Sequence, residues 1–269
     1  MKCFTSVFPL LAILGTGVML IAGCGAGSNT PNNTPSVTKA VHWSYEGAEG
    51  PEFWGQLDSA YGACSAGVSQ SPVNLTGQTS KALTNIEFHY QPSALKILNN
   101  GHTVQANYDA GSYIVIGGVR YDLLQFHLHA PSEHKLNGKT YAAELHLVHK
   151  SAAGQLAVVG VFLDNTAPAD NPAFTPVFGH LPTTNTPETA IAGVTVNAAA
   201  LLPTQQTTYR YSGSLTTPPC TEGVAWNVMT TPVTVSAAQL TAFSSLFPDG
   251  DARPVQPGNG RELDMDTTP

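Results

Sequence analysis

Three histidines in the sequence have the residue type and the spacing of metal ligands. His127 and His129 alternate with apolar residues in the segment Gln-Phe-His-Leu-His, and His146 lies in a similar segment, Glu-Leu-His-Leu. Side chains two residues apart in a β-strand share a face of the sheet, so His127 and His129 can both reach one ion, with Zn–N distances near ~2.0 Å. Three neutral imidazoles that leave one coordination position open are typical of catalytic zinc sites rather than closed structural ones.

A polar residue precedes two of these histidines at the same spacing. Gln125 lies two residues before His127, and Glu144 lies two residues before His146. A metal-bound imidazole needs an acceptor for its second ring N–H, so we expect Gln125 to orient His127 and Glu144 to orient His146. His149 is three residues beyond His146 and is excluded as a ligand, because its side chain faces the other side of the strand. Without these acceptors, a His-x-His pair is more often a surface or packing feature.

The elements that position these residues are predicted to be strands. From Leu83 onward, short apolar runs are separated by turn residues. Ser236–Phe247 is the best candidate helix, with Ser236 as its N-cap and core packing as its role. We therefore expect a mainly β (α+β) single domain with a mostly antiparallel sheet and a few short helices. The candidate strands are 86–90, 95–98, 103–108, 113–116, 123–129, 142–149, 156–163 and 224–229.

Composition and charge exclude several functions. Of 269 residues, 11% are charged and 42% are hydrophobic, and the formal net charge is −7. A hydrophobic fraction of this size excludes a disordered chain. Binding to a phosphate backbone depends on Lys and Arg, so an acidic chain with few charges is not expected to bind nucleic acid. The sequence also lacks the P-loop and GxGxxG patterns of nucleotide-binding sites.

The N-terminus resembles an export signal. Lys2 precedes an apolar run from Phe8 to Ala22, which is shorter than the ~20 residues of an ordinary transmembrane helix. The run leads to Cys24 in the sequence Leu-Ile-Ala-Gly-Cys, which resembles the lipobox of bacterial lipoproteins. We expect residues 1–23 to be a signal peptide, and residues 24–40 to be a lipidated Cys24 followed by a flexible polar tether. The alternative is ordinary cleavage near Gly27.

This interpretation predicts an exported protein of the cell envelope or periplasm, anchored to a membrane through lipid on Cys24. Of the four cysteines, Cys3 falls in the signal and Cys24 carries lipid. Cys64 and Cys220 remain, and they are expected to form a disulfide in an oxidising compartment. Closing so long a loop is worth ~5 kcal/mol in the chain-entropy model.

Ordered motifs between Trp43 and Arg261 make the chain resemble the α-class carbonic anhydrases of the bacterial secreted type. The resemblance implies one domain, residues 41–261, around a large twisted sheet, with 262–269 as a disordered tail. It implies one Zn²⁺ per chain and reversible hydration of carbon dioxide to bicarbonate and a proton, by attack of zinc-bound hydroxide. The motifs include HWSYEG (42–47), GPEFWG (50–55), QSPVNL (70–75), LNNGH (98–102), QFHLHAPSEH (125–134), YAAELHLVH (141–149) and YSGSLTTPPCTEGVAW (211–226).

The same motifs imply roles for individual residues. Zinc would be held by His127, His129 and His146. Thr216 would accept a hydrogen bond from the hydroxide and donate one to Glu133, because a carboxylate can only accept. His102 would carry the proton to solvent. Carbon dioxide would rest against an apolar wall, and Tyr45, Tyr211 and Gln105 would border the site. The residues of that wall would be Val148, Val158, Leu215, Val224 and Trp226.

The chain departs from the family at Asp251, where Asn is usual. In the family, the backbone carbonyl at this position orients the second histidine, and a backbone carbonyl survives the change from Asn to Asp, so the resemblance implies that the contact is kept. The remaining histidines are interpreted as structural or exposed. Other readings are a non-catalytic binding module, a zinc store or a hydrolase of activated esters. The resemblance also allows for a homodimer, although the sequence does not indicate an interface. These remaining histidines are His42, His89, His134, His149 and His180.

Overall fold

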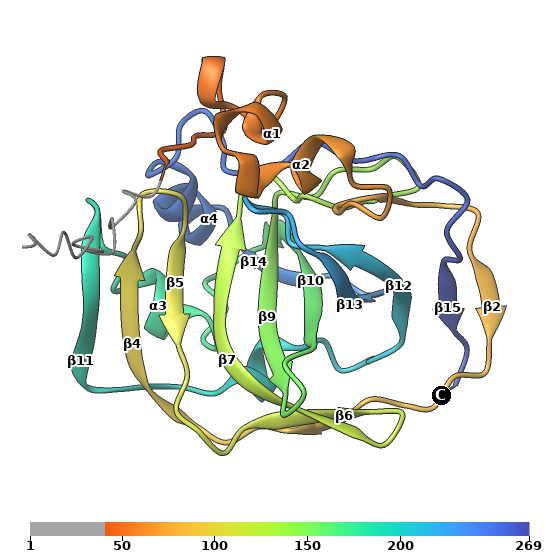
Figure 1. Cartoon of the computed structure of the whole chain (residues 1–269). Coiled ribbons are helices and arrows are strands. Elements are labelled where there is room, and N and C mark those ends of the chain that lie inside the picture. The colour runs from red at the N-terminus through yellow and green to blue at the C-terminus, as the bar shows by residue number, and fades with distance from the viewer. Residues whose placement is uncertain (1–40, 269) are drawn as a thin grey trace, which may run out of the picture. The chain divides into compact units, whose positions relative to one another are not determined.

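Strands between Thr79 and Asp266 join into one 13-stranded sheet in the computed structural model, which describes residues 41–268 (Figure 1). The predicted signal peptide, Cys24 and the tether lie outside these residues. The strands of the sheet are β2 (Thr79–Lys81), β3 (Glu87–His89), β4 (Ser93–Asn99), β5 (Val104–Asn107), β6 (Tyr113–Ile116), β7 (Val119–His129), β9 (Ala143–Ser151), β10 (Leu156–Ala167), β11 (Thr186–Val196), β12 (Thr208–Ser214), β13 (Glu222–Met229), β14 (Val233–Ser236) and β15 (Asp264–Asp266).

The helices are short, and a second, small sheet accompanies the large one. In Figure 1, α1 and α2 lie together beyond the ends of the strands. The helices are α1 (Trp54–Leu57), α2 (Ala63–Ala66), α3 (Thr175–Phe178) and α4 (Ala237–Ser244), with 3-10 turns η1 (Gly47–Glu49), η2 (Ser59–Tyr61) and η3 (Ala198–Leu201). The small sheet pairs β1 (Asn74–Leu75) with β8 (Lys135–Leu136).

The large sheet is mixed but mostly antiparallel, as the sequence predicts. Its main path runs β11-β4-β5-β7-β9-β10-β13-β12-β15-β2. Within this sheet, as described, parallel pairing is confined to β10 with β13, β10 with β14, and β15 with β2. A strand forms at each of the eight predicted positions, and β6 has the predicted bounds. The mainly β fold with few short helices is therefore confirmed.

Alternation along the central strands separates two buried clusters. In β9, Leu145 and Leu147 pack into the larger cluster, whereas Val148 packs against the smaller one with Val158 and Trp226. The period of two in a strand explains this division. The metal-ligand candidate His146 alternates with Leu145 and Leu147, so it lies on the face away from the larger core.

The predicted helix forms as α4, on the larger cluster. The Ser236 hydroxyl accepts a hydrogen bond from the backbone N–H of Gln239, and the Gln239 side chain accepts one from the N–H of Ser236. This reciprocal capping box satisfies two donors that a helix start otherwise leaves unpaired. Leu240 and Phe243 are buried. The helix ends at Ser244, before the predicted end at Phe247.

The predicted disordered tail at 262–269 is wrong for Asp264–Asp266. These residues form β15, which pairs with β12 and with β2. Asp266 is buried and accepts a hydrogen bond of 2.8 Å from the Arg210 guanidinium. Met265 packs against the smaller apolar cluster. Pairing with distant strands, rather than any local apolar pattern, orders the segment.

The predicted disulfide is present. Cys64 in α2 bonds to Cys220, which lies in the loop between β12 and β13. The bridge is buried beside Trp54, with Trp43 and Tyr45 packed against the same cluster. It therefore ties the N-terminal helices to the loop that contains Thr216. None of the helices in residues 41–268 combines the length and the apolar character needed to cross a bilayer.

His149 faces the core, as its position in the strand predicts. Its Nδ1–H donates to the Ala157 carbonyl, at 3.3 Å, and its Nε2 accepts from the Tyr90 hydroxyl, at 2.8 Å. Burial lowers the pKa of His149 to about 3. An unfolded histidine has a pKa of about 6.5. Below that pH the unfolded chain binds a proton that the folded chain rejects, so acid favours unfolding.

We expect the unfolding free energy of His149→Gln to fall less in acid than that of the wild type. The stability that neutral His149 contributes is complete above pH 6.5 and is lost as the pH falls toward 3. Between pH 7 and pH 5 this group accounts for about 2 kcal/mol of the fall in unfolding free energy. Urea unfolding at both pH values should show a fall smaller by that amount in His149→Gln. The exposed-site control His180→Gln should keep the wild-type fall, and an equal fall in all three proteins would contradict the assignment.

Candidate metal centre

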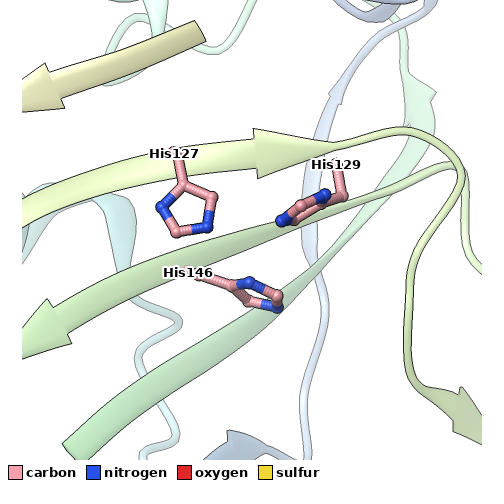
Figure 2. A group of neighbouring side chains, drawn as sticks. All are labelled: His127, His129 and His146. Carbon is pink, nitrogen blue, oxygen red and sulfur yellow. The ribbon is translucent and has the colours of Figure 1, made fainter. Parts of the chain in front are cut away.

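The pairing of β7 with β9 brings the three predicted ligands together (Figure 2). His127 and His146 are direct partners across the two strands, and His129 lies two residues further along β7. The ring centroids are 4.9 to 5.3 Å apart. One ring nitrogen from each histidine lies within 4.8 Å of the other two. Three nitrogens at this separation can bind one ion.

The two histidines of β7 are held through Nδ1. The Gln125 side-chain oxygen accepts from His127 Nδ1 at 2.8 Å, as predicted. The backbone carbonyl of Asp251 accepts from His129 Nδ1 at 2.6 Å, which is the contact that the family resemblance implies. These oxygens can only accept, so both Nδ1 atoms carry the proton and both Nε2 atoms keep a free lone pair.

His146 is held in the opposite sense. The Glu144 carboxylate accepts from His146 Nε2 at 2.9 Å, which confirms the predicted contact. Nδ1 of His146 is therefore the nitrogen with the free lone pair. His129 Nε2 is buried and has no hydrogen-bond partner among the described residues. A buried nitrogen without a partner is costly unless something binds it, so the residues present fit a metal ion.

The charges around the three rings favour a cation. Glu133 Oε2 is 3.6 Å from His129 Nε2 and 3.8 Å from His146 Nδ1. Burial, followed by the neighbouring imidazoles, lowers the pKa of His127 well below its usual value, and burial also lowers that of His146. Burial opposes the charged form of His129 as well, but Glu133 and Asp251 outweigh it and raise the pKa. Imidazole donors beside a carboxylate that favours positive charge suit a metal ion such as Zn²⁺.

A buried hydrogen-bond network supports Glu144. Glu144 accepts from the backbone N–H and from Nδ1 of His134, at 2.8 and 2.7 Å. His134 Nε2 then accepts from the Tyr211 hydroxyl at 2.7 Å, and that hydroxyl bonds Ser71 at 2.8 Å. The sequence reading of His134 as structural or exposed missed this role. Its place directly after Glu133, in the motif that follows the His127–His129 segment, was the available signal.

Glu133 and Thr216 lie at the same centre. Glu133 is buried, and its Oε1 accepts from the backbone N–H of Arg253 at 2.9 Å. Its Oε2 has no hydrogen-bond partner among the described residues. Thr216 is buried and lines the cavity in front of the three histidines. The expected bond from Thr216 to Glu133 stays a prediction, although Oε2 retains the capacity to accept it.

Both apolar and polar residues line the cavity. Most of the residues assigned to the apolar wall line it, but Val224 does not. Val224 is 2% exposed, because the smaller apolar cluster surrounds it. Tyr45 and Gln105 line the cavity together with Gln125 and the three histidines. The wall residues that do line it are Val148, Val158, Leu215 and Trp226.

His102 lies at the cavity wall, in the loop between β4 and β5. The Asn100 side chain accepts from the backbone N–H groups of His102 and Thr103, both at 2.9 Å, which fixes this turn. The ring of His102 stacks on Trp43, with centroids 3.6 Å apart and an angle of 7° between the planes. Burial, followed by the charge of His42, lowers the pKa of His102.

Comparisons with known proteins find carbonic anhydrases. The family model for eukaryotic-type carbonic anhydrases matches residues 49–266. A carbonic anhydrase of Nostoc sp. (strain PCC 7120) is 42% identical over 257 residues, which cover 94% of each chain. One from Klebsiella pneumoniae is 43% identical and covers 84% of this chain and 92% of its own. A solved hyperthermostable carbonic anhydrase from an active hydrothermal vent chimney has a TM-score of 0.80 and 42% identity, over 84% of this chain and 100% of that one.

We expect His146→Ala to abolish tight zinc binding, because it removes one nitrogen and leaves Glu144 beside an incomplete site. Gln125→Ala should weaken binding by about 10- to 100-fold, since it removes only the acceptor that orients His127. Competition with a zinc-binding dye measures both effects. His149→Gln, on the opposite face, should bind zinc as the wild type does. Wild-type affinity in His146→Ala would contradict the assignment of the ligands.

Proposed function

Because the chain belongs to the eukaryotic-type carbonic anhydrase family, we propose that it hydrates carbon dioxide reversibly to bicarbonate and a proton at one zinc ion held by His127, His129 and His146. One observation carries this proposal. Three imidazole nitrogens converge within 4.8 Å, and the other nitrogen of each ring is held by a fixed acceptor. When bound, zinc supplies a Lewis acid that lowers the pKa of water to about 7, as is established for carbonic anhydrases.

The cavity residues bind carbon dioxide and orient the reacting water. Val148, Val158 and Leu215 offer apolar surface to a molecule that has no net dipole. The Thr216 hydroxyl donates to Oε2 of Glu133, because a carboxylate can only accept. Thr216 must then accept from the water that reacts, which aims a lone pair of that oxygen at the carbon of carbon dioxide. Arg253 holds Oε1 of Glu133 and so fixes which oxygen faces Thr216.

His102 takes the proton that hydration releases. Recombination of a proton with its donor runs at a diffusional rate of ~10¹⁰ M⁻¹s⁻¹. For a donor of pKa about 7, whose acid dissociation constant is ~10⁻⁷ M, proton release to water alone is therefore no faster than ~10³ s⁻¹. An imidazole has a pKa close to that of the donor. The lowered pKa of His102 also helps it to release the proton to buffer.

We expect His102→Ala to lower kcat in dilute buffer by roughly ten-fold or more. The ratio kcat/KM should change little, because hydration itself does not use the shuttle. Stopped-flow hydration of carbon dioxide measures both constants, and added imidazole should restore much of kcat. An unchanged kcat in dilute buffer would show that the protons leave by another route.

We also propose that the protein is exported and anchored to a membrane through lipid on Cys24. The disulfide between Cys64 and Cys220 supports export, because structural disulfides persist in oxidising compartments. The residues around Cys24 support the anchor through their likeness to a lipobox.

Cys24→Ser should move the protein from the membrane fraction to the soluble fraction without changing its specific activity. Immunoblots of the two fractions, with hydration assays on each, measure this change. If the wild-type protein were found only in the soluble fraction, the lipid anchor would be contradicted and only the proposal of export would remain.

A further inference from the structure

His102 lines two spaces. It lines the cavity that contains the three metal-ligand candidates, and it also lines a neighbouring surface hollow that contains His42. Trp43 and Tyr45 line both spaces as well. The stacked contact with Trp43 therefore holds the ring of His102 between the reaction centre and the outer hollow.

His42 is the nearest imidazole on the outer side. The ring centroids of His42 and His102 are 6.4 Å apart, with an angle of 46° between the planes. At this separation the rings do not bond directly, but one solvent water can bridge two nitrogens with little loss of strength. His42 Nδ1 donates to Glu49 Oε2 at 3.0 Å. Since the carboxylate fixes Nδ1 as the donor, Nε2 of His42 is left as the proton acceptor.

The hollow suits the release of a proton. The side chains of His42 and Glu49 are 72% and 50% exposed, so both meet bulk buffer. Glu46 and Asp249 line the same hollow, and its lining among the described residues includes no Lys or Arg. An acidic surround attracts protonated groups and lowers the cost of placing a proton there.

We propose that His42 and Glu49 form an outer proton relay, which passes the proton from His102 to bulk buffer. This inference rests on the proposed function, since it needs His102 as the shuttle. In the transfer, an N–H bond of the His102 imidazolium breaks and an N–H bond forms at Nε2 of His42, through one bridging water. The other proton of His42 stays on Nδ1 and keeps its hydrogen bond to Glu49, so His42 becomes a cation paired with that carboxylate. Buffer then removes the Nε2 proton and restores both rings.

Stability does not account for the pair. An exposed ion pair of this kind contributes little to the folding free energy. The chain carries a matched pair elsewhere, in which His89 Nε2 lies 3.4 Å from Glu87 and the ring of His89 stacks on Tyr113. His89 lines neither the cavity nor the outer hollow. It therefore serves as a control for removal of an exposed histidine from a His–Glu pair.

The test is stopped-flow hydration of carbon dioxide in dilute and in imidazole buffer. We expect His42→Ala to lower kcat in dilute buffer by about three-fold, with kcat/KM unchanged and with recovery in imidazole. Glu49→Gln should cause a smaller decrease in kcat, because it removes the negative charge that stabilises protonated His42 but keeps Nε2 of His42 as the proton acceptor. In a His102→Ala background, His42→Ala should have no further effect. His89→Ala should match the wild type throughout.

Four results would overturn the relay. An unchanged kcat in His42→Ala, beside a lowered kcat in His102→Ala, would mean that His102 delivers its proton directly to buffer. An equal loss of kcat and kcat/KM would mean that His42 only supports the structure. A wild type without hydration activity, or a His102→Ala variant with full kcat, would refute the relay together with the function or shuttle on which it rests. Because the wild type and His102→Ala are measured in the same series, these failures can be told apart.

Discussion

The antiparallel pairing of β7 with β9 is the constraint on which the rest of the site depends. It sets His127 directly opposite His146 and leaves His129 two residues away on the same face. Because the side-chain period of a strand is two, a shift of register by one residue would turn these rings into the core and bring Leu128 or Leu145 to the cavity. The large apolar cluster behind the strands opposes such a shift, so burial of one face fixes the geometry of the other.

Contacts from distant parts of the chain then hold each ring in one tautomer. Gln125 and Glu144 act within the two strands, whereas the carbonyl of Asp251 comes from a loop near the C-terminus. The next residue but one, Arg253, binds Glu133 through its backbone and Cys64 through its guanidinium. The disulfide from Cys64 to Cys220 links these contacts covalently to the loop that contains Thr216. The parts of the centre are thus tied to one another through a few buried polar contacts, each of which would be costly to leave unpaired.

The sequence could predict the features that depend on local periodicity. Alternation in the segments around His127 and His146 was enough to assign the strands, the shared face and the two acceptors Gln125 and Glu144. It could not predict that β15 adds to the sheet, because that segment has only one apolar residue and is ordered by distant strands and Arg210. The burial of Val224 and the bond of His134 to Tyr211 likewise depend on packing between remote segments. The contact from the Asp251 carbonyl came only from the family resemblance, since no side-chain pattern marks a backbone acceptor.

The central claim is that a metal ion at these three histidines carries out the hydration of carbon dioxide. Stopped-flow hydration on the purified protein, before and after treatment with a zinc chelator and again after zinc is returned, tests it most directly. The account predicts rapid hydration that falls to the uncatalysed rate when zinc is removed and returns in proportion to the zinc bound, up to one ion per chain. Full hydration activity in protein shown to contain no metal would contradict it.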